Sequence, residues 1–111
     1  QLLKPLIDIP RIGKLASNML KKALGTLVAR DTEGAKAVIE SDDEVDALYN
    51  QIYRELLLYM IEDPKTIKKA TYLLWVAHDL ERIADRATNI SERTIFMVDG
   101  IKYELYGLEE N

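Results

Sequence analysis

The dipeptide Asp63-Pro64 constrains the fold of this chain more than any other feature. Aspartate is a favoured helix cap, and a proline at the first position of a helix cannot continue the preceding one. On both sides of the dipeptide, apolar residues recur at helical spacing for about thirty residues. Two long helices joined by so short a connection must pack side by side and antiparallel. The sequence therefore predicts a helical hairpin formed by residues 32–62 and 64–99.

A third helix is expected before this hairpin, over residues 10–30, with Pro10 at its first position. We expect residues 1–9 to form an extended arm. Gly100 is a typical helix stop, which would leave 101–111 as a tail. Since no strand pattern competes, the predicted fold is all-α. It is an antiparallel three-helix bundle with long, spectrin-repeat-like helices, and residues 1–111 form one domain.

Composition excludes several classes of protein. The chain has no cysteine, so disulfides and thiolate chemistry are absent, and its formal net charge of −4 argues against nonspecific nucleic-acid binding. The longest apolar runs are far shorter than the ~20 residues that span a bilayer. We therefore expect a cytoplasmic protein with no membrane span. The start at Gln1 suggests that this chain is part of a longer protein.

Two pairs of acidic residues stand out on the predicted hairpin. Asp42 and Asp46 are four residues apart, as are Glu81 and Asp85, so each pair lies on one face of its helix. Asp46 and Glu81 are equally distant from the turn at Asp63-Pro64, and the same holds for Asp42 and Asp85. In a regular antiparallel hairpin the two pairs should therefore face each other at matched heights.

Four converging carboxylates repel one another unless something compensates their charge. A bound metal ion is one solution, because iron, zinc, manganese, magnesium and calcium all accept carboxylate oxygen. We therefore predict a metal site whose ligands are Asp42, Asp46, Glu81 and Asp85. The alternative is a solvated acidic face or one neutralised by nearby arginines, Arg82 and Arg86, although the helical wheel turns both toward the outside.

Two further polar residues extend the acidic stripe of the last helix. His78 lies one turn before Glu81, and Asn89 lies one turn after Asp85. We expect both to act, if at all, as second-shell or structural residues beside the metal. The paired Glu-x-x-His signature of di-iron bundles is missing, and so are a glycine-rich phosphate loop and a nucleophile elbow. The chain is therefore not expected to be an enzyme; a metal-dependent hydrolase remains the weaker alternative.

The segment 78–90, His-Asp-Leu-Glu-Arg-Ile-Ala-Asp-Arg-Ala-Thr-Asn-Ile, closely resembles a motif of the PhoU phosphate-signalling proteins. The stretch Ser-Asp-Asp-Glu-Val-Asp-Ala-Leu-Tyr from residue 41 is similar to the other acidic motif of that family. The resemblance extends over about residues 9–101. PhoU proteins contain two three-helix repeats, and this chain resembles the C-terminal one.

The resemblance implies a regulator of phosphate transport and of the phosphate-responsive two-component system. Its partners would be the cytoplasmic subunit of a phosphate ABC transporter, a phosphate sensor histidine kinase, or both, and a homodimer is compatible with it. The alternative is a PhoU-like regulatory domain appended to a sodium–phosphate cotransporter. In either setting, the acidic motifs of the family imply metal binding at the four carboxylates already named.

Overall fold

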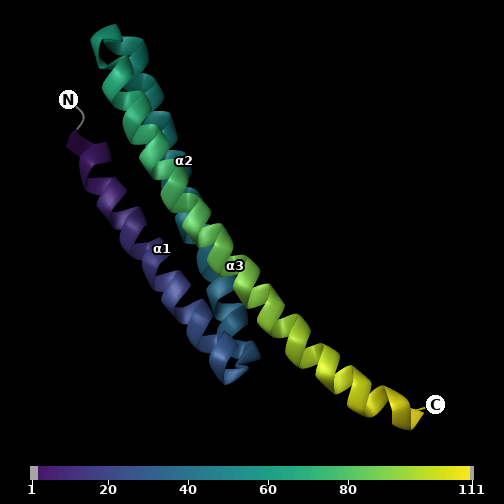
Figure 1. Ribbon diagram of the computed structural model, residues 1–111. Helices are drawn as coiled ribbons and strands as arrows, with labels where there is room; N and C mark the ends of the chain where they lie inside the picture. The colour runs from purple at the N-terminus through teal and green to yellow at the C-terminus, as the bar shows by residue number, and fades with distance from the viewer. Residues whose placement is uncertain (1–2, 111) are drawn as a thin grey trace.

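The computed structural model describes the backbone of residues 3–110 and the side chains of residues 4–100. Its helices are α1 (Leu3–Ala29), α2 (Thr32–Glu62) and α3 (Ile67–Glu110), with a short 3₁₀ helix, η1 (Pro64–Thr66), between the last two. The three long helices lie side by side in an elongated bundle, 67 × 23 × 16 Å (Figure 1). The predicted all-α three-helix bundle is confirmed.

The connection between α1 and α2 is tight because its backbone hydrogen bonds close the end of α1. The amide of Asp31 donates to the carbonyl of Thr26 at 2.9 Å, and the amide of Arg30 donates to that of Leu27 at 3.3 Å. This Schellman-type ending requires a left-handed residue, which here is Arg30 with φ 55°. The Asp31 side chain then caps α2 by accepting from the amide of Gly34 at 2.9 Å.

The connection between α2 and α3 depends on Asp63. Its amide donates to the carbonyl of Tyr59 and ends α2, while its side chain accepts from the amide of Lys65 and caps η1. Pro64 occupies the first position of η1, as the sequence predicts. The first turn after Pro64 is 3₁₀ rather than α-helical, so α3 begins at Ile67. Asp63 therefore both ends α2 and caps η1.

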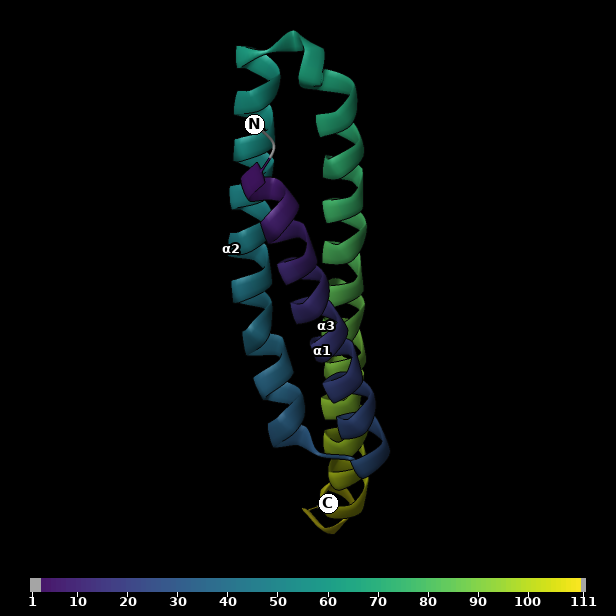
Figure 2. The ribbon, with the colours of Figure 1, turned by 90° about the vertical axis from the view of Figure 1, so that its left-hand side faces the viewer.

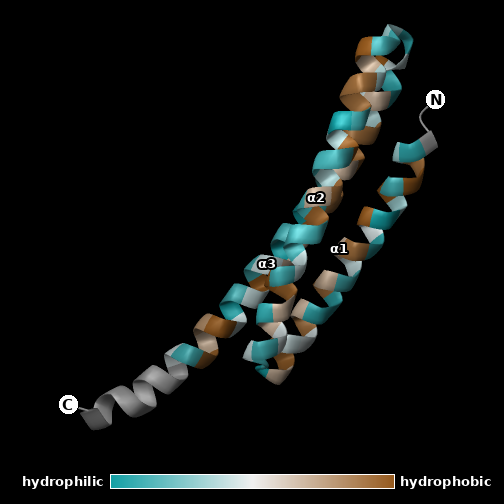
Figure 3. Cartoon of the chain, turned by 180° about the vertical axis from the view of Figure 1, so that it is seen from behind, coloured by the Kyte–Doolittle hydropathy of each residue, from teal (hydrophilic) through white to brown (hydrophobic). Residues whose placement is uncertain are grey.

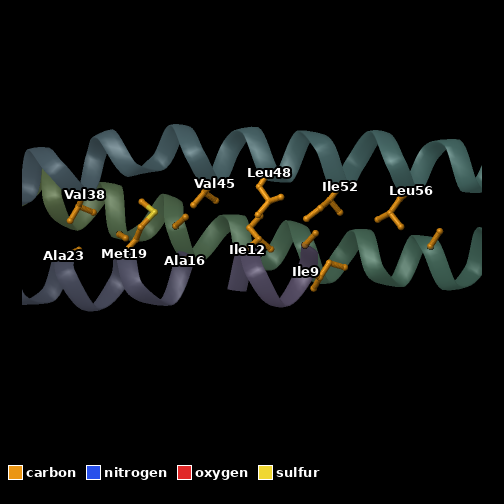
Figure 4. Packing of buried hydrophobic residues seen from close by; sticks show 14 residues of the cluster. Ile9, Ile12, Ala16, Met19, Ala23, Val38, Val45, Leu48, Ile52 and Leu56 are labelled. Carbon is orange, nitrogen blue, oxygen red and sulfur yellow. The ribbon is translucent and has the colours of Figure 1, made fainter. Parts of the chain in front are cut away.

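The core runs the length of the bundle, between all three helices (Figure 4). Branched aliphatic residues dominate the contribution of α2, where Ile52 and Leu56 are fully buried. By contrast, the fully buried side chains of α3 are small. They are Ala70, Ala77, Ala84, Ala87 and Ser91. Small side chains let neighbouring helices approach closely, so α3 can pack tightly against α1 and α2 at these positions.

The predicted arm over residues 1–9 is wrong where the structure describes it. The helix begins at Leu3 and continues through Pro10, which lies inside α1 and is exposed. The physical reason is tertiary packing, because Pro5 and Ile9 lie one turn apart on the buried face of α1. Lys4 also reaches across to Glu55 of α2, with 2.7 Å between its Nζ and the Glu55 Oε1. These contacts offset the missing amide hydrogen bond at Pro10. Residues 1–2 lie outside the described part.

The predicted end of the last helix at Gly100 is also wrong. α3 continues through Gly100 to Glu110, so the described part of the expected tail, 101–110, is helical, and Asn111 lies outside it. A single glycine costs a helix only about 1 kcal/mol relative to alanine, which its helix-forming neighbours can offset. Figure 1 shows α3 running past the end of the bundle where α1 joins α2.

None of the described helices is long and apolar enough to cross a membrane. Figure 3 shows hydrophilic residues dominating the middle of α3. That part of α3 carries the predicted acidic pair.

Candidate metal centre

The hairpin register predicted from the sequence is present in the structure. Tyr49 and His78, which are equally distant from the Asp63-Pro64 turn, face each other with ring centroids 6.3 Å apart. Asp46 and Glu81 lie one turn further along this face, and Asp42 and Asp85 lie two turns further. Figure 2 shows α2 and α3 side by side over this stretch, with α1 lying across the pair.

Three of the four predicted ligands come together directly. Asp42, Asp46 and Asp85 each offer a carboxylate oxygen, and these oxygens lie within 4.8 Å of one another. Asp42 and Asp46 are half-buried on α2, and Asp85 is exposed on α3. The fourth, Glu81, is half-buried and lies outside this closest group. Its charge interacts with those of Asp46 and Asp85, so it belongs to the same cluster.

Two carboxyl groups of the cluster, those of Asp42 and Glu81, hold their protons more tightly than usual. Partial burial, followed by the charges of Asp46, Asp85 and Asp43, raises the pKa of Asp42 to about 6. Burial is also the main cause that raises the pKa of Glu81, with smaller contributions from Asp85 and Asp46, while His78 opposes them. Near neutral pH these carboxylates are charged at an energetic cost, which a cation would relieve.

An oxygen without a hydrogen-bond partner supports the fit to a cation. The Oδ1 atom of Asp42 is buried and accepts no hydrogen bond. Arginine does not fill this role, because no ion pair in the described part of the chain involves Arg82 or Arg86, and both side chains are exposed. An all-carboxylate donor set with a free buried oxygen suits hard oxygen-seeking ions.

His78 and Asn89, the two residues predicted beside the ligands, differ in their relation to the acidic cluster. His78 is exposed and lies close enough to Glu81 for its charge to lower the pKa of that carboxyl. Asn89 is exposed one turn beyond Asp85, and none of the side-chain hydrogen bonds to a carboxylate in the described part of the chain involves it. The second-shell roles of both residues stay predictions.

Tyr49, which was not among the residues predicted around the site, also lies beside the cluster. It is half-buried between Tyr53 and His78, with a ring-centroid distance of 6.3 Å to each. Burial and the nearby charge of Glu81 raise the pKa of its hydroxyl. The signal was available, since Tyr49 follows Asp46 on the same face of α2 by three residues.

Without metal, replacing Asp42 should stabilise the protein at neutral pH. The folded-state pKa of about 6 exceeds the ordinary 3.8, so the stabilisation from protonating Asp42 is complete below 3.8 and lost as the pH rises through 6. Because Asp42 is partly solvated, we expect Asp42→Asn to gain about 1 kcal/mol, or about 4 °C in melting temperature, at pH 7.5 in EDTA. The gain should shrink at pH 4.5.

Thermal denaturation followed by circular dichroism measures this effect. Glu40→Gln removes the same charge from an exposed site on α2 and serves as the control. Equal shifts for the two variants at pH 7.5, or a larger gain for Asp42→Asn at pH 4.5, would contradict the strained cluster.

Comparison with known proteins assigns the family. The model of the PhoU domain matches residues 9–94, which is most of the chain. The chain belongs to the PhoU family. The predicted resemblance is thereby confirmed, and its two acidic motifs are the ones that build the cluster between α2 and α3.

Two curated relatives carry the same kind of name. A phosphate-specific transport system accessory protein PhoU homolog 2 of Thermotoga maritima is 46% identical over 104 residues, covering 94% of this chain and 44% of the relative. A PhoU homolog of the same description from Caulobacter vibrioides is 49% identical over 93 residues, covering 84% of this chain and 40% of the relative. The chain thus spans less than half the length of these relatives.

A solved structure shares the fold. The crystal structure of PhoU from Pseudomonas aeruginosa superimposes with a TM-score of 0.81 at 36% sequence identity, covering 85% of this chain and 45% of that one. The PhoU domain described here therefore has the helical architecture of an experimentally determined family member.

Proposed function

We propose that this PhoU domain is a non-enzymatic regulator of phosphate uptake, in which a metal-loaded acidic face fixes the spacing of α2 and α3. The relatives that it matches are named accessory proteins of phosphate-specific transport systems. The observation that carries the metal role is the group of carboxylate oxygens of Asp42, Asp46 and Asp85 within 4.8 Å of one another.

The proposed role of the metal is structural and electrostatic. Asp42 and Asp46 on α2 and Asp85 on α3 would hold the ion, with Glu81 adding negative charge beside them. A bound cation would neutralise their repulsion and join the two helices. Divalent or trivalent ions of iron, zinc, manganese, magnesium or calcium suit these oxygen ligands.

The proposed partners are the cytoplasmic ATP-binding subunit of a phosphate transporter and the cytoplasmic domain of a phosphate sensor histidine kinase, which would place the domain at the inner face of the membrane. The names of the relatives support the transporter directly. They also favour an accessory protein over the alternative, a domain appended to a sodium–phosphate cotransporter. We further propose that the domain controls transcription through its contact with the kinase.

A binding measurement tests this proposal. The chain is immobilised, and the transporter's ATP-binding subunit and the kinase's cytoplasmic domain from the same genome are titrated over it in separate experiments. We expect saturable binding of the transporter subunit with a micromolar dissociation constant, ~1–10 µM, typical of transient regulatory contacts. No binding of either protein at about 100 µM would overturn the proposed partnership.

A further inference from the structure

The charge of the chain is divided unevenly among its helices. α1 contains five lysine and arginine residues and a single acidic one, Asp8, which is buried beside Lys4. α2 contains eight acidic residues and two basic ones. The formal net charge of −4 therefore conceals one basic helix, whose charge the acidic site between α2 and α3 does not explain.

The solvent-facing side of α1 combines basic residues with exposed apolar ones. Figure 2 looks onto this side, with α2 and α3 behind it. At 100° per residue its members fall within an arc of about 140°, opposite the buried side chains of Ile12, Ala16 and Met19. We call this set the α1 outer face; it consists of the exposed residues Ile7, Arg11, Lys14, Lys21, Leu24 and Val28.

The α1 outer face differs from an ordinary solvated helix face in two respects. Val28 is 86% exposed and Ile7 is 63% exposed, although aliphatic side chains of this size are most often buried. Among the described side chains, no ion pair involves Arg11, Lys14 or Lys21. The face therefore offers uncovered apolar surface together with uncompensated positive charge.

We propose that α1 binds the surface of an anionic membrane through its outer face, with the helix axis parallel to the membrane plane. Helices that combine basic and apolar residues on one face bind at the level of the lipid headgroups. Lys14 and Lys21, at the centre, would bind lipid phosphates through their ammonium groups. Ile7 and Val28, about 30 Å apart along the helix, would enter the headgroup layer at either end.

The distribution of the apolar residues favours a lipid surface over other anionic partners. The lysines separate Ile7 from Leu24 and Val28, so the face lacks the continuous apolar patch found at the centre of protein interfaces. Lipids adapt to single side chains and need no such patch. A nucleic acid would pair with the lysines but would leave the apolar side chains in water.

The proposed orientation leaves the acidic cluster accessible. Glu55 faces α1, since it accepts the contact from Lys4. Asp46 precedes Glu55 by nine residues, which places the two on opposite sides of α2 at 100° per residue. Asp46 groups instead with Asp85 of α3. A membrane-bound α1 would therefore leave the cluster open to metal and to protein partners.

Vesicle sedimentation tests the charge requirement. In EDTA and about 50 mM salt, vesicles of phosphatidylglycerol and phosphatidylcholine should bind the chain with half-saturation on the order of 1 mM lipid. Lys14→Gln/Lys21→Gln should weaken binding about thirtyfold, because each basic residue at an anionic surface contributes about fivefold. Lys36→Gln/Arg54→Gln makes the same charge change on the exposed surface of α2 and should alter binding less than about twofold.

The apolar requirement has a matched control of its own. Ile7→Ser/Val28→Ser should weaken binding at least about tenfold, because it removes the side chains that enter the headgroup layer. Leu58→Ser/Ile61→Ser removes two exposed aliphatic side chains from α2 and should leave binding unchanged. Circular dichroism confirms that each variant keeps its helical fold.

A fluorescent label tests the orientation, because the chain has no native cysteine. An environment-sensitive fluorophore is attached at Ser17→Cys, on the exposed side of α1, or at Asn50→Cys, on the exposed side of α2. Addition of phosphatidylglycerol vesicles should shift the emission of the first label to shorter wavelength and leave that of the second unchanged.

Several results would overturn the proposal. Absence of sedimentation at about 10 mM lipid excludes binding of this strength. Full binding by Lys14→Gln/Lys21→Gln, or a shift of the Asn50→Cys label alone, would show that another surface meets the lipid. Binding of a poly-glutamate peptide to a chain that ignores the vesicles would instead assign the α1 outer face to an acidic protein partner. These assays contain no metal, transporter subunit or kinase, so their failure leaves the proposed function standing.

Discussion

Adding metal to this PhoU domain at pH 7.5 should raise its melting temperature by about 10 °C for the ion that fits the acidic cluster. At a concentration one hundred times the dissociation constant, a ligand that binds only the folded state adds about 2.7 kcal/mol of stability. For a domain of this size that corresponds to roughly 10 °C. Part of this binding energy is relief of the burial of charge and of the repulsion that raise the pKa of Asp42 and Glu81.

The metals to compare are Mn²⁺, Fe³⁺, Zn²⁺, Mg²⁺ and Ca²⁺, each added to protein first treated with EDTA. The variant Asp42→Asn/Asp85→Asn removes one ligand from each helix and should lose nearly all of the gain. Its control is Glu40→Gln/Glu44→Gln, which makes the same charge change at two exposed positions of α2. The gain should also fall as the pH is lowered through about 6, because protons then compete for Asp42.

If no cation changes the melting temperature, the proposed metal binding is wrong. An equal gain in the control and in Asp42→Asn/Asp85→Asn would move the binding to another part of the acidic surface. Neither result would affect the family assignment, which depends on the sequence and fold.

Truncating Ile52 should cause a large loss of stability. Its side chain is fully buried on α2, within the core (Figure 4). Ile52→Ala removes three carbon atoms from a site that rigid helices cannot fully close, and such changes cost about 2–5 kcal/mol. We expect about 3 kcal/mol, measured as a lower urea midpoint with an unchanged slope.

The same helix offers a matched control. Ile61 is 77% exposed near the end of α2, so Ile61→Ala makes the identical chemical change outside the core. It should cost less than about 0.5 kcal/mol. Similar losses for the two variants would show that the packing of α2 against α1 and α3 differs from that described.

Much of the site could be read from the residue pattern. Asp63-Pro64 located the turn, because an aspartate cap followed by a proline is a strong signal for the boundary between two helices. Equal distances from that turn then paired the acidic residues. The facing of Tyr49 and His78 agrees with this register. Which three carboxylates come closest, and that Glu81 stands slightly apart, could not be predicted, because this depends on side-chain rotamers and on helix spacing.

The two errors of boundary share one physical cause. Proline and glycine were read as local stop signals at Pro10 and Gly100, but their local cost is a few kcal/mol at most. At Pro10, burial of Pro5 and Ile9 and the contact of Lys4 with Glu55 outweigh it. Pro5 and Ile9 already have helical spacing in the sequence, but Pro10 was interpreted as the start of the helix and this spacing was not used.

Local spacing and recognisable residues were enough to predict the helical class, the hairpin turn, the pairing of the acidic motifs and the family. Three other features follow from how the helices pack: where α1 begins, which oxygen of Asp42 is buried without a partner, and which face of α1 stays uncovered. Those features depend on how closely the three helices approach, and that distance is set jointly by side chains far apart in the chain.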